Sequence, residues 1–290
     1  MDKFFIITNR AKDKDLQVTS TIVEYLQEQG KSCATYEIGS SGNDGNQQAQ
    51  GYTNPSMIPE GTECILVLGG DGTMIRAARD VAGRGIPLFG VNLGTLGYLA
   101  EVDRNSVFHA LDHLMDDRYT TERRMMLQGR VFRGKNFIGE SIALNDIVIA
   151  RKSGLKVLQF DNYVNGDYLN TYRADGVILA TPTGSTGYSL SAGGPIVSPQ
   201  ASLFVMTPLA PHSLNKRSVI LPPEDVISVQ LGPGREVDQE EAMVYFDGDA
   251  KLPLVTGDRV EISRAVLDTV FIKIHHSSFL EVLRRKMTDL

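Results

Sequence analysis

The chain has 290 residues, of which 42% are hydrophobic and 22% are charged, and its formal net charge is −6. This composition is that of a soluble globular protein, and the length suits about two domains, each with its own core. Because the charge balance is acidic and no block of Lys or Arg interrupts it, we expect neither a nucleic-acid partner nor binding to an anionic membrane surface.

The two cysteines, Cys33 and Cys64, each lie in an apolar, strand-like stretch. Two buried free thiols are therefore expected rather than a disulfide, which fits a cytoplasmic protein. The apolar run at residues 4–7 is too short for the core of a signal peptide, and no later run approaches the length of a membrane span.

The first hundred residues alternate between patterns of strand and helix. Strands are predicted at 4–8, 34–38, 64–68 and 87–92, and helices over 16–26, from Thr73 to about Ala82, and near 105–117. Apolar strands that alternate with helices predict a parallel sheet with helices on its faces. The segment 39–61, rich in Gly, Ser, Asn and Gln, is predicted to be a mobile loop.

After about residue 120 the pattern changes to short β-rich runs separated by turns. Asn165-Gly166 between two alternating runs predicts a hairpin, and "FDGDAK" at 246–251 predicts a second one. We therefore predict an α/β domain over 1–120 and an all-β sandwich over 121–267. The last segment, 268–290, reads as a strand and an amphipathic helix that return to the first domain.

The stretch "ILVLGGDGTMIRAAR" (65–79) places Asp71 among three glycines where a strand becomes a helix. Glycines there let a ligand approach the main chain, and free amides at a helix start attract phosphate. A carboxylate repels phosphate, so Asp71 suits the hydroxyl that receives a phosphoryl group, or a metal that bridges the phosphates. A tight turn with Asp71 as a capping residue explains the stretch equally well.

Two other patterns resemble sites of different kinds. Residues 30–32 resemble the end of a P-loop, but Tyr25 stands where the first glycine should be and a strand follows. His109 and His113 have the spacing of zinc ligands, yet Ala110 replaces the catalytic Glu, and a solvated helix face is the preferred interpretation. No protein metal site is predicted.

A second cluster, "TYRADGVILATPTGSTGYSLSAGGPIVSP" (171–199), carries more hydroxyls and glycines than a plain strand needs. Together with "GGDGT" (69–73), "GVNLGTLGYLAEV" (90–102), "ALNDIVIAR" (143–151) and "PLAPHSL" (208–214), it resembles the NAD kinase family. The resemblance covers about residues 65 to 250, with the motifs in order. It implies phosphorylation of the 2′-hydroxyl of the adenosine ribose of NAD by ATP, with a divalent metal, in a homo-oligomer whose site lies between the domains.

The resemblance also implies roles for single residues. Asp71 is the expected general base, with Gly72 beside it, and Asn145 and Asp146 are expected to bind ribose hydroxyls. The remaining expected contacts to NAD or the donor are Arg76, Tyr98, Lys156, Arg173, Asp175, Thr183, Thr186, Gly187, Tyr188, Ser189, Leu190, Ser191, Ala210 and Asp247. Several of these also have structural explanations: a solvated helix arginine for Arg76, core packing for Tyr98 and a hairpin-turn residue for Asp247.

Two positions depart from the family pattern, because Asp146 replaces a Glu and Gly187 replaces an Ala. The shorter Asp146 has less reach, and the methyl missing at Gly187 is expected to loosen a contact. Two rival functions remain at this point: a lipid kinase that shares the GGDGT turn, and a non-catalytic module that senses NAD(P). The sequence does not decide whether the phosphate donor is ATP or polyphosphate, or whether the acceptor is NAD or NADH. It also leaves open which metal is preferred and whether the oligomer is a dimer or a tetramer.

Overall fold

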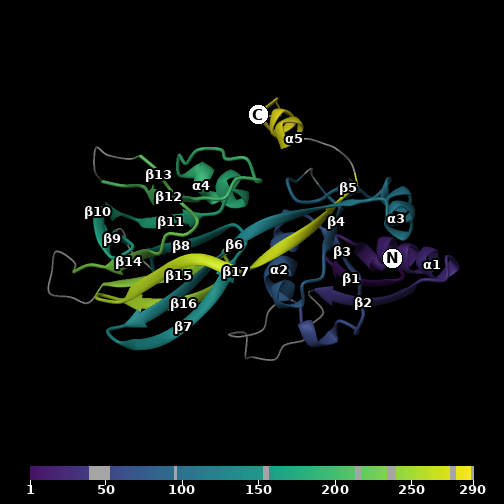
Figure 1. The fold of residues 1–290 in the computed structure, drawn as a ribbon, viewed down its shortest axis with the longest axis horizontal. Helices are drawn as coiled ribbons and strands as arrows, with labels where there is room; N and C mark the ends of the chain where they lie inside the picture. The colour runs from purple at the N-terminus through teal and green to yellow at the C-terminus, as the bar shows by residue number, and fades with distance from the viewer. Residues whose placement is uncertain are drawn as a thin grey trace. The chain divides into compact units, whose positions relative to one another are not determined.

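The computed structural model describes residues 1–38, 53–94, 97–152, 157–212, 217–233, 240–274 and 279–288 (Figure 1). The chain divides into two compact units, Met1–Arg123 with Thr269–Leu290, and Arg124–Asp268. The predicted fold class is confirmed, since the first unit is α/β with a parallel sheet and the second is an all-β sandwich. Among the helices that the structure describes, none has the length and apolar character needed to span a bilayer.

The first unit is built on a parallel sheet. Its elements are β1 (Lys3–Asn9), η1 (Lys14–Leu16), α1 (Gln17–Glu28), β2 (Ser32–Ile38), η2 (Pro55–Met57), β3 (Cys64–Gly69), α2 (Asp71–Val81), η3 (Ala82–Arg84), β4 (Leu88–Asn92), β5 (Val102–Asp103), α3 (Val107–Met115) and α5 (Phe279–Thr288). The strands are ordered β2-β1-β3-β4, and β5 adds to β4. All these pairs are parallel, so the carboxyl ends of the strands share one edge of the sheet.

The core of this unit forms because every residue of β3 and β4 is buried. Alternate side chains such as Phe4, Leu66 and Phe89 pack in one cluster with Leu26 of α1 and Leu111 of α3. Both helices are amphipathic, and they bury the same stripe that the 3.6-residue spacing predicts.

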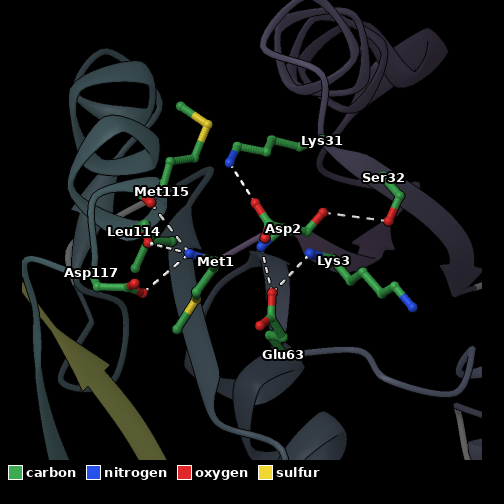
Figure 2. Close-up of polar contacts among 9 residues, drawn as sticks. All are labelled: Met1, Asp2, Lys3, Lys31, Ser32, Glu63, Leu114, Met115 and Asp117. Carbon is green, nitrogen blue, oxygen red and sulfur yellow. Dashed lines mark hydrogen bonds and ion pairs between the residues drawn. The ribbon is translucent and has the colours of Figure 1, made fainter.

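The N-terminal ammonium of Met1 donates hydrogen bonds at the carboxyl end of α3 (Figure 2). The nitrogen of Met1 donates to the carbonyls of Leu114 and Met115, both at 3.3 Å, and to the carboxylate of Asp117 at 3.1 Å. A positive charge at this position adds a donor to carbonyls at the end of the helix and complements the helix dipole. The contact anchors the first residue of the chain beside α3.

The second unit is a sandwich of two antiparallel layers. Its strands are β6 (Thr120–Arg133), β7 (Asn136–Ala143), β8 (Asp146–Arg151), β9 (Leu158–Val164), β10 (Asp167–Ala174), β11 (Gly176–Ala180), β12 (Phe204–Leu209), β13 (Val219–Leu221), β14 (Ile227–Leu231), β15 (Glu241–Phe246), β16 (Ala250–Val255) and β17 (Arg259–Lys273), with η4 (Thr183–Thr186) and α4 (Tyr188–Ser191) between β11 and β12. One layer has the order β13-β12-β11-β8-β15-β16. The other joins β10, β9, β14 and β17, with β6 and β7. The start of β6 and the end of β17 belong to the first unit, where Phe271 of β17 pairs in parallel with Leu88 of β4.

Side chains from both layers meet in one core that includes Phe160, Phe204, Phe246 and Ile262. The opposite face of the first layer buries Ile178 and Val205 under residues of the segment after α4, including Val197. The loop that carries the hydroxyl- and glycine-rich cluster is therefore packed on a sheet. This packing holds its backbone in place.

Both predicted hairpins are present. Asn165 and Gly166 join β9 to β10 with φ values of 53° and 89°, and Asp247 and Gly248 join β15 to β16 with 51° and 77°. Positive φ at both central residues gives the turn the twist that antiparallel strands require.

Three details of the secondary structure differ from the predictions. Helix α2 begins at Asp71 with Gly70 as its N-cap, two residues before the predicted start at Thr73, which is a buried residue of the first turn. Strand β17 runs unbroken over two runs that the sequence separates. The predicted loop is described only over 53–61, where the short η2 helix follows a buried Thr53 whose amide donates to Asp80, so this part is anchored at its first described residue.

Cys33 is only half-buried, whereas Cys64 is fully buried, and both thiols are free. Burial raises the pKa of Cys33 to about 11 and that of Cys64 further. Both side chains therefore stay protonated near neutral pH and pack as small apolar groups.

Candidate active site

The glycine-rich turn lies at the carboxyl end of β3, between two neighbouring parallel strands. The carbonyl of Gly70 accepts hydrogen bonds from the amides of Thr73 (2.9 Å) and Met74 (3.0 Å), which start α2. Gly72 is exposed, and a Cβ there would meet no atom within 4 Å. The first turn of α2 is therefore open to a ligand at a sheet edge where α/β proteins commonly bind phosphates.

Asp71 is held by the segment that follows β4. Its Oδ2 accepts from the amide of Tyr98 at 2.8 Å, and its Oδ1 accepts from the amide of Leu99 at 3.1 Å. A Cβ at Gly97 would overlap Oδ1, so only glycine lets the backbone approach the carboxylate this closely. The result is a half-buried carboxylate with a fixed orientation.

Tyr98 and Arg76 are the other expected contacts of this unit. The ring of Tyr98 lies 6.2 Å from that of Phe279, and Nζ of Lys286 lies 4.7 Å from its centroid. Partial burial and the charge of Asp71 raise the pKa of the Tyr98 phenol. Arg76 lies half-buried one turn after Gly72 on α2.

In the second unit, Asp247 organises the turn that carries Asn145 and Asp146. Its carboxylate accepts hydrogen bonds from three successive amides, those of Leu144 (2.8 Å), Asn145 (2.8 Å) and Asp146 (3.2 Å). Asp247 also donates its own amide to the carbonyl of Asp146 at 3.0 Å. The hairpin explanation of Asp247 accounts for its backbone angle, and these bonds give its side chain a positioning role.

The pair that Asp247 positions has unusual electrostatics. The side chain of Asp146 is buried, and burial, with a further contribution from the charge of Asp247, raises its pKa to about 7. Asn145 has a buried Oδ1 that accepts no hydrogen bond from any residue that the structure describes. A buried polar atom without a partner is costly, and such an atom is commonly satisfied by a ligand or water.

The cluster "TPTGSTGYSLS" lies against this pair. A Cβ at Gly187 would lie 3.5 Å from Nδ2 of Asn145 and 3.9 Å from Oδ2 of Asp146. Thr183 is buried and accepts from Nη1 of Arg124 at 3.2 Å, and the hydroxyl of Thr186 donates to the carbonyl of Thr183. The missing methyl at Gly187 therefore leaves space directly beside Asn145 and Asp146.

The remaining expected residues of this unit fall into two groups. Ser189 is fully buried, and its hydroxyl lies 3.3 Å from that of Thr207, so its side chain is engaged inside the unit. Tyr188, Leu190, Ser191, Arg173 and Ala210 are exposed. Ala210 has a φ of 45°, a conformation in which a side chain is strained.

Asp175 forms an ion pair with Arg151, with 3.1 Å between Oδ1 and Nε. Burial and the charges of Asp175 and Asp146 raise the pKa of Tyr188, which places this phenol in the field of both carboxylates. Lys156 lies outside the described residues.

Two contacts of these sites were not predicted from the sequence. Gly97, which admits the carboxylate of Asp71, lies within the quoted motif "GVNLGTLGYLAEV", but nothing in the motif indicates its neighbour. Arg151, the partner of Asp175, ends the motif "ALNDIVIAR", and nothing in that motif indicates the ion pair. His109 and His113 stack edge to face at 4.7 Å, and no group of three metal-ligating side chains occurs among the described residues.

An anchored carboxylate at a glycine-rich strand-to-helix turn in the first unit, and a polar turn with an unsatisfied amide oxygen in the second, are features that suit a nucleotide-dependent phosphotransferase. Comparison with protein-family models agrees with this class. The model of the ATP-NAD kinase N-terminal domain matches residues 4–119, and the model of the ATP-NAD kinase C-terminal domain matches residues 144–274. The chain belongs to the NAD kinase family.

Similar curated proteins support this assignment over the full length. The NAD kinase of Agathobacter rectalis is 48% identical over 289 residues, covering 99% of each chain. That of Lachnospira eligens is 44% identical and covers 99% of this chain and 100% of its own. The fold also matches an Archaeoglobus fulgidus NAD kinase solved in complex with ATP, with a TM-score of 0.74, 24% identity and 99% of each chain covered.

Proposed function

We propose that Asp71 is the general base of the NAD kinase reaction, in which ATP phosphorylates the 2′-hydroxyl of the adenosine ribose of NAD. The observation that carries this proposal is the anchoring of Asp71 by the amides of Tyr98 and Leu99. Each carboxylate oxygen has about two acceptor positions, and each uses one of them for an amide. The carboxylate therefore keeps acceptor capacity for a hydroxyl while its orientation is fixed.

The reaction balances with this residue as base. Asp71 takes the proton of the ribose hydroxyl, and the oxygen forms a bond to the γ-phosphorus of ATP. The bond from this phosphorus to the β–γ bridging oxygen breaks, and ADP leaves with the electron pair. The open first turn of α2 offers amides to the donor phosphates.

The acceptor ribose is assigned to Asn145 and Asp146. The unsatisfied Oδ1 of Asn145 supports this assignment, because a ribose hydroxyl would supply its missing donor. Gly187, Tyr188 and Asp175 are assigned to the same nucleotide, since Gly187 borders the pair and Tyr188 lies in the field of Asp146 and Asp175. A sugar-binding pair of this kind is unlike the apolar acceptor pocket that a lipid kinase needs, and Asp71 is superfluous in a module that only senses NAD(P).

A divalent cation belongs to the proposal as a companion of ATP. Mg²⁺ is commonly bound by substrate phosphates with one or two carboxylates, and Asp71 is the carboxylate at the phosphate-binding turn. Bound there, the metal would neutralise charge on the transferred phosphoryl group. A cytoplasmic location and a homo-oligomer complete the proposal, supported by the free thiols and by the family pattern.

The test is a coupled assay that measures NADP formed from NAD and ATP, with Mg²⁺ varied. We expect NADP at a rate that requires ATP and metal. Light scattering on the same preparation tests assembly, and an active species at the 31.8 kDa monomer mass would refute the homo-oligomer. Consumption of ATP with a lipid acceptor and none with NAD would refute the acceptor assignment.

A further inference from the structure

A cation that the sequence motifs do not include lies over the glycine-rich turn. Lys12 belongs to the segment between β1 and η1. A Cβ on Gly70 would lie 2.6 Å from its Nζ, and a Cβ on Gly94 would lie 3.5 Å from it. The ammonium therefore lies where β1, β3 and β4 end side by side, at the N-cap of α2.

The backbone that carries Lys12 is fixed on both sides. The amides of Lys12 and Asp13 donate to the carbonyl of Asn9 at 2.9 and 3.0 Å, and Nδ2 of Asn9 donates to Oγ1 of Thr73 at 3.2 Å. Asp13 is buried and accepts from the amide (2.9 Å) and hydroxyl (2.6 Å) of Thr19. Lys12 is therefore held next to the first turn of α2, and only its side chain is free to adjust.

The ammonium charge of Lys12 is not neutralised by a carboxylate within the described part of the chain. Its ammonium makes no ion pair or side-chain hydrogen bond among those residues, whereas nearby Arg10 pairs with Glu37 at 3.5 Å. Asp71, on the same turn, directs its carboxylate to the amides of Tyr98 and Leu99 instead of to Lys12. Two opposite charges at one turn thus remain separate, one open to an anion and the other to a hydroxyl.

We propose that the ammonium of Lys12 binds the phosphates of ATP at the glycine-rich turn. This inference rests on the proposed placement of the donor at that turn. The arrangement explains how a carboxylate is tolerated where phosphates bind, because Lys12 offsets its repulsion. As the bond to the γ-phosphorus breaks, negative charge collects on the departing ADP, and the same ammonium stabilises it.

The experiment compares Lys12→Gln with Lys14→Gln. Lys14 is an exposed lysine of η1 two residues away, so its replacement removes the same charge from the same segment. For Lys12→Gln we expect the KM for ATP to rise about 10- to 100-fold, as for loss of a charge-assisted hydrogen bond, with the KM for NAD within about twofold. Lys14→Gln should leave both values unchanged, and Lys12→Arg should recover part of the affinity.

Inorganic tripolyphosphate is the second probe, because it carries the phosphates of ATP without the nucleoside. It should compete with ATP in the parent, and its inhibition should weaken in Lys12→Gln by about the same factor as ATP binding. Equal kinetics of Lys12→Gln and Lys14→Gln, with Asp71→Asn inactive, would overturn the assignment of Lys12 and leave the proposed function intact. A rise in the KM for NAD alone would instead show that the turn binds the acceptor, and the proposed donor placement would fail with it.

Discussion

Asp71 in the first unit and Asp247 in the second both hold their carboxylates against successive backbone amides, and they differ in how many amides each carboxylate accepts. Asp71 accepts two amides, one at each oxygen. Asp247 accepts three, two of them at the same oxygen, and lies in a hairpin turn. A carboxylate offers about four acceptor positions, so Asp71 retains more capacity for a substrate than Asp247 does.

The same type of hydrogen bond, from a backbone amide to a carboxylate, therefore has two different structural roles. In the first unit the amides orient the carboxylate itself. In the second unit the carboxylate orients the amides, and with them the side chains of Asn145 and Asp146. Amide hydrogen bonds around an aspartate therefore do not by themselves identify a catalytic group, because a base also needs acceptor capacity for the substrate.

The largest expected effect separates the two aspartates directly. Asp71→Asn removes the proposed base, and turnover should fall about 10²- to 10⁴-fold, the usual contribution of a positioned base. Asn also places an NH₂ against one of the two amides, so a loss of about 1 kcal/mol in stability should accompany it. The matched control is Asp247→Asn, which creates the same conflict without removing a base. If both variants lose activity equally, the distinction between them is wrong.

The second prediction concerns Asp146, whose pKa of about 7 exceeds the ordinary value of 3.8. A raised carboxyl pKa means that the folded state is fully favoured below about pH 4 and loses stability as the pH rises through 7. The difference corresponds to at most about 4 kcal/mol at pH 8. Asp146→Asn stays neutral, so its free energy of unfolding should exceed that of the parent at pH 8 and approach it only below about pH 4. Urea titrations of both proteins measure this gap, and a gap independent of pH would contradict the burial of a charged Asp146.

The third prediction tests the positioning role of Asp247. Asp247→Ala leaves the amides of Leu144, Asn145 and Asp146 without their acceptor, which should destabilise the second unit by about 2–3 kcal/mol. The KM for NAD should rise because Asn145 and Asp146 lose their fixed orientation, while the KM for ATP should change little. A variant with lowered melting temperature and parental kinetics would confine Asp247 to a structural role.

Much of the fold follows from the sequence, because hydrophobic periodicity and turn residues act locally. The buried run of β3, the stripe of α1 and the hairpin at Asn165-Gly166 each follow from a few neighbouring residues. The start of α2 was misplaced because Thr73 is a better N-cap by type than Gly70, yet Gly70 takes the extended conformation that a cap needs. The continuity of β17 was missed because its middle, with exposed Val266, lacks the alternation of a half-buried strand.

The contacts within each candidate site were harder to foresee, since they join residues far apart in the chain. The approach of Gly97 to Asp71, of Asp247 to Leu144 and of Lys12 to Gly70 depends on which strands are neighbours. The residue types in the motifs indicate which chemistry is possible, but they do not show which side chains lie close together in the folded chain. Asp175 illustrates the limit, because its ion pair with Arg151 is invisible in either motif alone.

The smallest effect is also the most specific, because it should separate binding from stability at one residue. Asn145→Ala removes a buried Oδ1 that has no partner, so the free energy of unfolding should change by less than about 1 kcal/mol despite the truncation. If a ribose hydroxyl satisfies that atom, the variant should lose about 1–2 kcal/mol of binding, seen as a rise of about 5- to 30-fold in the KM for NAD. The matched control is Asn162→Ala. Among the described residues, the buried Oδ1 of Asn162 also has no partner, but its Nδ2 donates to Asn170 at 2.8 Å within the sheet.

The Asn162→Ala variant should lose stability and keep the parental KM for NAD. Calorimetric unfolding and steady-state kinetics on both variants measure the contrast, and an unchanged KM for NAD in Asn145→Ala would remove this residue from the acceptor site.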